Sequence, residues 1–418
     1  MTKKIELLLP AGNLEKLRFA IAYGADAVYM GSADFSLRSN TGDDFSTIEG
    51  LEKGINYAKE KGVNVYLTTN IFARNEDLDN LEVYLNDIKH LNFDAIIISD
   101  PGVLGIVKDI LPNKKIHLST QANTTNWRSV KFWQGMGITR VILARELSLE
   151  EIKTIHEKCP DVELEAFVHG SMCMAYSGRC TMSNYMTNRD SNHGECSQSC
   201  RWSWDLVEEK RPDEVYHVEE DQHGTYLFNS KDLCMIEHLQ ELAEAGVFSF
   251  KIEGRAKSIY YLSVVGKMYR EAIDTYFVKG GGYRQEWMDE INTTSNRGFT
   301  VGFAYGKYAG DMQNYDFNTP TRAAEFVAVA QEYLGDKKMI QLLAKNRINK
   351  DDELELVTPN EVFPISLDTA YNQKGEDVPY VNTNTIFMVP FDREVPAFSI
   401  IRKRVKPEIQ LPVIQNQV

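Results

Sequence analysis

Four of the six cysteines are concentrated in one short part of the chain. Cys173, Cys180, Cys196 and Cys200 are separated by six, fifteen and three residues. Four thiolates brought together are the ligand set of a structural zinc ion or of an iron–sulfur cluster. Zinc sites favour cysteine pairs two residues apart, and this segment contains no such pair, so the spacing favours an iron–sulfur cluster over zinc. Four unligated thiols are the remaining alternative.

A group of cationic and polar side chains is the second candidate for chemistry. Guanidinium groups pair with carboxylates in a two-pronged geometry, so a cleft lined by arginines suits a small anion. The candidates are Arg38, Gln121, Arg145, Arg179, Lys231, Arg255 and Arg297. His169 lies four residues before Cys173 and could donate a proton or contact substrate, and a hydrogen-bonded core histidine is an equal alternative. The sequence motifs of serine hydrolases, zinc proteases and P-loops are not found.

Strands alternating with helices must position these side chains. Short apolar runs predict eight strands, near residues 5–9, 27–30, 63–67, 95–98, 116–118, 140–143, 162–167 and 248–252. The helical patterns between them indicate right-handed βαβ units and a parallel sheet. Eight such units favour a closed (β/α)8 TIM-like barrel over residues 1–310. A doubly wound sheet is less favoured because no glycine-rich dinucleotide-binding turn follows the first strand.

The barrel interpretation places several candidates at one mouth. Residues just past the carboxyl ends of the strands face a shared opening, and Arg145 and Arg255 occupy such positions. The cysteines lie in a long excursion after the seventh strand, residues 170–225. Alternation at residues 202–206 and an apolar run at 215–218 predict a hairpin with its turn at 211–213, and a helix is predicted over 233–245.

The chain changes character beyond residue 320. Short alternating runs divided by Gly, Asn, Asp and Pro predict a small antiparallel all-β barrel domain over residues 320–405, followed by a tail over 406–418. No secretory leader and no apolar run of membrane-spanning length is seen, so we expect a cytoplasmic protein that does not enter the membrane.

The net charge of −14 opposes non-specific attraction to nucleic acid. An RNA partner would therefore need a concentrated basic patch. The candidate patches are Lys251, Arg255 and Lys257 in one segment, and Arg402, Lys403 and Arg404 near the carboxyl end.

A signature lies at the start of the cysteine segment. Residues 165–183 follow the pattern E-x-F-x-x-G-S-M-C, then G-x-C, then a serine three residues later. This pattern resembles the signature of peptidase family U32, the collagenase-like peptidases. Further landmarks match in order, at residues 8–12, 119–121, 144–146, 229–233 and 251–255. Within the family the chain is most similar to the bacterial tRNA hydroxylation protein P group.

The resemblance implies a function. It implies 5-hydroxylation of the wobble uridine of tRNA without O2, with prephenate as oxygen donor and a 4Fe–4S cluster on Cys173, Cys180, Cys196 and Cys200. In this hypothesis the C-terminal β domain is the RNA platform, with residues 402–404 just beyond its last strand. A paralogous U32 subunit is a candidate partner that would offset the acidic charge. Two alternatives remain, a collagenase-like peptidase and an RNA-binding protein with a structural metal site.

Overall fold

Eight parallel strands close into a barrel. The computed structural model describes residues 4–32, 35–36, 43–173, 175–201, 205–208, 211–217, 230–306 and 321–405. The barrel strands are β1 (Glu6–Pro10), β2 (Ala27–Met30), β3 (Asn64–Thr69), β4 (Ala95–Ile98), β5 (Lys115–Leu118), β6 (Arg140–Ile142), β7 (Glu163–Ser171) and β11 (Val247–Ile252). Each strand pairs in parallel with the next, and β11 pairs with both β7 and β1. The predicted (β/α)8 barrel is confirmed.

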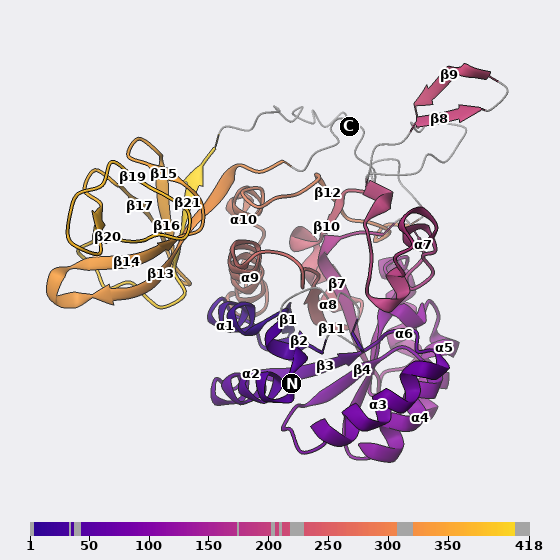
Figure 1. Ribbon diagram of the computed structural model, residues 1–418. Helices are drawn as coiled ribbons and strands as arrows, with labels where there is room; N and C mark the ends of the chain where they lie inside the picture. Colours follow the sequence, from indigo (N-terminus) through magenta and orange to yellow (C-terminus); the bar gives the residue numbers. More distant parts are fainter. Residues whose placement is uncertain are drawn as a thin grey trace.

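Helices surround the barrel on its outside (Figure 1). They are α1 (Leu14–Ala22), α2 (Ile48–Glu60), α3 (Asn75–Ile88), α4 (Pro101–Ile110), α5 (Trp127–Gly135), α6 (Leu149–Lys158), α8 (Leu239–Glu244) and α9 (Ile259–Asp274). Local sequence fixes where many of them begin. Ahead of α6, the Ser148 hydroxyl accepts from the Glu151 amide, and the Glu151 carboxylate accepts from the Ser148 amide. None of the described helices has the length and apolar character needed to cross a membrane.

The excursion between β7 and β11 carries short elements. It contains α7 (Met182–Thr187), the 3-10 turns η3 (Ser191–His193) and η4 (Ser199–Arg201), and the antiparallel hairpin β8 (Asp205–Glu208) and β9 (Arg211–His217). The hairpin is confirmed, but residues 211–213, predicted as its turn, belong to β9 instead. Pro212 lies between the paired residues Arg211 and Val215, where the register of the ladder shifts, and proline is tolerated at such irregularities.

The predicted helix over residues 233–245 is wrong at its start. β10 (Asp232–Cys234) runs antiparallel to the end of β7, with Leu233 opposite Gly170. β10 also pairs with β12 (Phe299–Thr300), and helix α8 begins only at Leu239. The reason is the pairing with β7, which no local pattern of three residues reveals.

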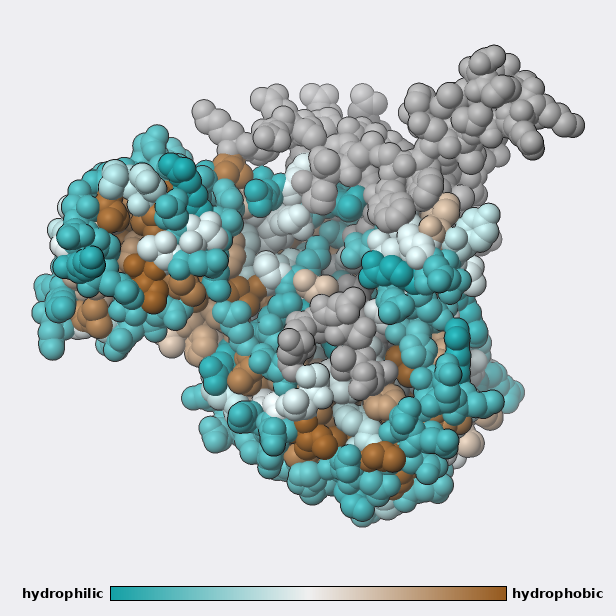
Figure 2. Space-filling view, in the orientation of Figure 1, coloured by the Kyte–Doolittle hydropathy of each residue, from teal (hydrophilic) through white to brown (hydrophobic). Residues whose placement is uncertain are grey.

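The C-terminal domain is all-β and antiparallel, as predicted. Its main sheet has the order β17-β16-β21-β13-β14-β20-β18. The strands are β13 (Ala324–Leu334), β14 (Met339–Ala344), β16 (Leu354–Val357), β17 (Val362–Ile365), β18 (Tyr371–Asn372), β20 (Ile386–Pro390) and β21 (Ile400–Arg404), with β15 (Ile348–Asn349) and β19 (Tyr380–Val381) forming a separate pair. In the view of Figure 2, hydrophilic residues cover most of the described surface of this domain and of the barrel.

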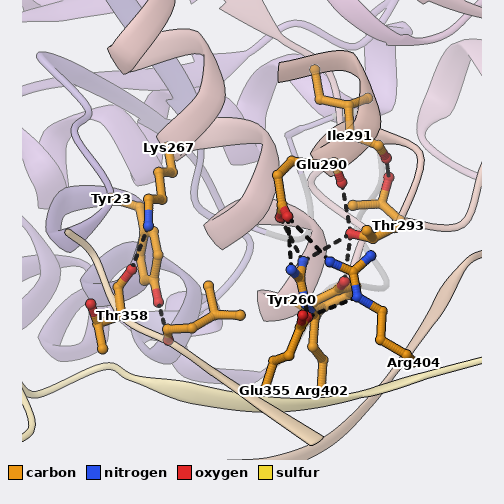
Figure 3. Close-up of polar contacts among 12 residues, drawn as sticks. Tyr23, Tyr260, Lys267, Glu290, Ile291, Thr293, Glu355, Thr358, Arg402 and Arg404 are labelled. Carbon is orange, nitrogen blue, oxygen red and sulfur yellow. Dashed lines mark hydrogen bonds and ion pairs between the residues drawn. The ribbon is translucent and has the colours of Figure 1, made fainter. Parts of the chain in front are cut away.

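The C-terminal domain packs against α1, α9 and α10 (Gln285–Ile291) of the barrel domain (Figure 1). Side chains from both domains share one apolar cluster that includes Phe19, Tyr260, Val329 and Ile400. Beside it the Arg402 guanidinium donates to Glu290 of α10 and Glu355 of β16 (Figure 3). Arg402 therefore connects the two domains.

The predicted position of residues 402–404 beyond the last strand of the C-terminal domain is wrong. The three residues lie within β21 rather than beyond the last strand. Arg402 is fully buried, and Arg404 contacts the same two glutamates, Glu290 and Glu355. Because its charge is already neutralised inside the domain junction, Arg402 does not present a guanidinium to RNA phosphates.

Candidate functional site

A cavity of about 360 Å³ lies at the carboxyl ends of the barrel strands. Its walls come from the ends of β3 and β11, from the segments that follow β5 and β6, and from residues 173–200 of the excursion. In (β/α)8 barrels this end of the strands carries the active site. The volume falls in the range of small-molecule sites, about 300–1,000 Å³.

All four cysteines of the excursion line this one cavity. Cys173 and Cys196 are exposed, and Cys180 and Cys200 are partly buried. Across the described ranges, no three His, Cys, Asp or Glu side chains lie close enough together to hold a single metal ion. Each cysteine of a 4Fe–4S cluster binds a different iron, so its ligands stand farther apart than the ligands of one zinc. Four thiols around a shared cavity are a donor set that fits an iron–sulfur cluster, and the same four side chains are the alternative ligands of a zinc ion.

The first turn of the excursion is fixed to two loops of the barrel. The Ser177 amide donates to Glu146 (2.8 Å), which follows β6. Gly178 has a φ of +73° and packs against the backbone of Gln121, so tightly that a Cβ there would overlap the Gln121 carbonyl. Only glycine combines this backbone angle with this close approach.

The second half of the excursion is fixed to the loop that precedes α3. The Phe72 amide donates to the Asn192 carbonyl (3.2 Å), and the Asn192 side chain donates to the carbonyl of Cys180 (2.7 Å). An ion pair joins Arg74 to Asp190 (3.0 Å). The cysteine loops are therefore held over the mouth by protein contacts on both sides.

Cationic side chains line the same cavity. Its described lining contains four cationic residues and one acidic residue. The cationic residues are Arg145, Arg179, Lys251 and Arg255, and the acidic residue is Glu253. Arg255 is buried and donates to Ser36, to the Thr68 hydroxyl (3.3 Å) and to the Gly31 carbonyl (3.5 Å). The Arg145 guanidinium lies 3.9 Å from the centre of the Phe167 ring. This excess of positive charge among the lining residues suits a small anion with carboxylate groups.

Lys251 is the functional candidate that sequence reasoning placed incorrectly, in a surface patch for RNA. Its ammonium is buried and donates to Glu165 (2.7 Å). Glu165 also accepts from Arg140 (3.1 Å), and Arg140 donates to Glu6 (2.6 Å). Burial lowers the pKa of Lys251, and the charge of Glu165 opposes that shift. The available signal was a charged residue inside an otherwise apolar strand, because such a residue must find a partner in the barrel interior.

Three described site candidates, His169, Lys231 and Arg297, do not join the described cavity lining. His169 is buried between Tyr269, Tyr261 and Phe299, and its Nδ1 lies 3.3 Å from the Tyr269 hydroxyl. Burial, assisted by the charge of Lys257, lowers the pKa of His169 to about 3. The imidazole is then neutral near pH 7, and its position opposes the predicted catalytic role. Lys231 and Arg297 are partly buried outside the lining, and Arg38 lies outside the described residues.

Gln121, Arg145, Arg179 and Arg255 are thus the predicted polar residues that the structure brings together, alongside the four cysteines. Of the predicted basic patch at residues 251–257, Lys251 and Arg255 face the cavity and only Lys257 is partly exposed. The chemistry that this arrangement allows is capture of an anion beside four cysteine thiols.

Comparison with known proteins places this site in context. The model of peptidase family U32 matches residues 12–314, and the model of the peptidase family U32 C-terminal domain matches residues 322–402. A Bacillus subtilis protein named tRNA hydroxylation protein P1 is 42% identical over 382 residues, covering 90% of this chain and 89% of that protein. An Escherichia coli protein named tRNA hydroxylation protein P is 40% identical over 418 residues, covering 90% and 91%. A Porphyromonas gingivalis protein named collagenase is 31% identical over 390 residues, covering 90% of each.

Proposed function

The chain belongs to peptidase family U32, and from this premise we propose that it is a tRNA-modifying enzyme that hydroxylates C5 of the wobble uridine without O2. Prephenate is the proposed oxygen donor, and a 4Fe–4S cluster on Cys173, Cys180, Cys196 and Cys200 is the proposed cofactor. The observation that carries the proposal is the meeting of four thiols and four cations around one cavity at the barrel mouth. Relatives named for tRNA hydroxylation support the substrate class.

The chain's own residues provide binding and orientation in this proposal. The two carboxylates of prephenate are attracted by three arginines, Arg145, Arg179 and Arg255. Lys251 lies in the same lining, and the Gln121 side chain is available for hydrogen bonds. The Glu165 carboxylate holds Lys251 in place. A bound cluster would supply a redox-active or Lewis-acidic centre at the same wall. The loops anchored through Ser177 and Asn192 hold the cysteines beside the anion site.

The proposed location is the cytoplasm, where a tRNA substrate is available. A paralogous U32 subunit is retained as a candidate partner. Its basic surface would add phosphate contacts that an acidic chain does not supply in large number.

Peptidase activity is the second candidate, because one relative is named collagenase. Two observations count against it. The sequence lacks the serine-hydrolase and zinc-protease motifs, and the described lining of the cavity includes no histidine that could serve as a general base.

Anaerobic purification distinguishes a bound iron–sulfur cluster from a structural zinc ion. We expect a brown protein with broad absorbance near about 400 nm that disappears in Cys196→Ala. The matched control is Cys159→Ala, which removes a buried thiol outside the cavity and should keep the colour. A colourless protein that holds one zinc would support a structural metal site instead.

Mass spectrometry of tRNA tests the reaction. In a strain that lacks this protein and any paralogue, grown without O2, 5-oxygenated uridine should be absent, and it should return with the wild type or Cys159→Ala but not with Cys196→Ala. Unchanged 5-oxygenated uridine in the deletion strain contradicts the proposed reaction. Cleavage of denatured collagen that survives loss of all four cysteines would favour the peptidase.

A further inference from the structure

The place where RNA meets this protein needs an explanation, because the net charge is −14 and Arg402 is buried. Broad electrostatic attraction to phosphates does not provide the affinity under these conditions. Recognition through the faces of unpaired bases is the alternative, since stacking on aromatic rings needs few cations.

Two tyrosines on the cysteine excursion have the required exposure. Tyr176 is 65% exposed and also lines the cavity, and Tyr185 on α7 is 86% exposed. Exposed aromatic rings beside a cavity are typical of sites where a partner completes their burial. Two arginines on the same segment, Arg179 and Arg189, are also exposed. Rings and guanidinium groups together match a single strand of nucleic acid, with bases to stack and phosphates to pair.

The tyrosines are attached to rigid positions. Tyr176 begins a tight turn in which the Arg179 amide donates to the Tyr176 carbonyl (2.9 Å). The turn is fixed to the barrel through Ser177 and Gly178, as described above. On α7, the Ser183 hydroxyl lies 2.9 Å from that of Ser197, which ties the helix to the loop carrying Cys196. Because the backbone that carries each ring is already anchored, stacking of a base does not have to order the loop as well.

We propose that Tyr176 and Tyr185 stack on unpaired bases of the tRNA loop next to the nucleotide that enters the cavity, and that Arg179 and Arg189 contact its phosphates. This inference rests on the proposed function for its choice of RNA. The proposed RNA contact surface is therefore the excursion and not strand β21. Because about two phosphates are paired, the dependence of log K on log salt should be shallow, with a slope of about −1.4.

The test is binding of an unmodified anticodon stem-loop RNA to the anaerobic holoenzyme, followed by fluorescence anisotropy. Tyr176→Ala and Tyr185→Ala should each weaken binding about 5- to 150-fold, the loss expected for one stacked base. Tyr176→Phe and Tyr185→Phe keep the ring and should stay within about twofold of wild type. The control is Phe132→Ala, which removes a 62% exposed ring from α5 outside the described cavity lining and should leave binding unchanged.

Two results would overturn the inference. One is wild-type affinity in both alanine variants, and the other is equal weakening by alanine and phenylalanine, which would assign the effect to the hydroxyl. The failure of the proposed function looks different. A wild type that binds the stem-loop through these rings but leaves the uridine unmodified would refute the hydroxylase and keep the stacking surface. If the wild type modifies tRNA and the alanine variants are equally active and bind equally tightly, the hydroxylase proposal stands and the stacking surface is refuted.

Discussion

Replacing Arg402 with methionine should destabilise the protein by about 3 kcal/mol. The guanidinium is fully buried, donates to Glu355 (2.6 Å), and donates to both carboxylate oxygens of Glu290 (2.6 and 2.8 Å) (Figure 3). Methionine fills much of the same volume but donates no hydrogen bond. Two carboxylates at the domain junction would then lose most of their compensating charge.

The magnitude follows from what remains after the change. Breaking a buried ion pair costs about 3–5 kcal/mol because the partner charge stays buried. We expect the lower end because both glutamates are 24% exposed and Arg404 still reaches Glu355 at 2.9 Å. The control is Lys403→Met on the same strand. Its ammonium lies farther from its carboxylates, 3.4 Å from Asp352 and 3.6 Å from Glu325, so the cost should be smaller than for Arg402→Met.

The cost should also depend on pH. Burial raises the pKa of Glu290, but the hydrogen bonds and charge of Arg402 outweigh burial and hold this pKa below its ordinary value of 4.5. A carboxyl group whose pKa is lowered by folding contributes stability above its unfolded pKa and loses that contribution as pH falls through its folded pKa. The difference between wild type and Arg402→Met should therefore be largest near pH 7 and should shrink below about pH 4.5.

Urea unfolding at several pH values, followed by tryptophan fluorescence and by calorimetry, measures these differences. Equal costs for Arg402→Met and Lys403→Met would refute the reasoning. A cost that stays constant from pH 7 to pH 4 would refute the assignment of that cost to ionised Glu290.

Three further predictions concern the barrel. In a double-mutant cycle by urea unfolding, Lys251→Met and Glu165→Gln together should cost less than the sum of the two single changes, because each single change leaves an uncompensated buried partner; additive costs would contradict the pairing. Gly178→Ala should lower tRNA modification, measured by mass spectrometry, far more than Gly62→Ala, since both residues have a φ of +73° and only the Cβ at Gly178 would meet neighbouring atoms; equal effects would exclude a role for the anchored turn. Because the pKa of buried His169 is lowered to about 3, its imidazole must take up a proton when the protein unfolds in acid. The free energy of unfolding should therefore fall by up to about 1.4 kcal/mol per pH unit below pH 6.5. His169→Asn should reduce that slope in urea unfolding at pH 5–7, and an unchanged slope would argue against a buried neutral imidazole.

The barrel and part of its mouth were predictable from sequence for a physical reason. Parallel strands covered by helices are apolar on both faces, and such runs alternating with amphipathic helices have few other packing solutions. Once the strands are placed, the position after each strand end follows, which is why Arg145 and Arg255 were correctly expected at one cavity. The rule gave no guidance at Lys231 and Arg297, because neither follows directly from a barrel strand.

Features that depend on distant partners were not predictable. Arg402 has the local sequence of an exposed basic cluster, but it is buried beside two partners, Glu290 and Glu355, which lie 112 and 47 positions earlier in the chain. Leu233 likewise belongs to a strand because of Gly170. In both cases the determining contact lies outside any window that propensity or periodicity can examine.

The charge distribution connects the site to its proposed substrates. The chain is strongly acidic, yet four cations line a cavity that is walled by low-dielectric protein. Such walls concentrate the local field, so a small dicarboxylate gains affinity inside the cavity while a long duplex, which contacts the outer surface, gains little. An enzyme built in this way would select RNA by the bases it can unstack and hold beside the cavity. In the stacking proposal the exposed rings of Tyr176 and Tyr185 would provide this recognition, and stacking needs fewer cations than contact with many phosphates.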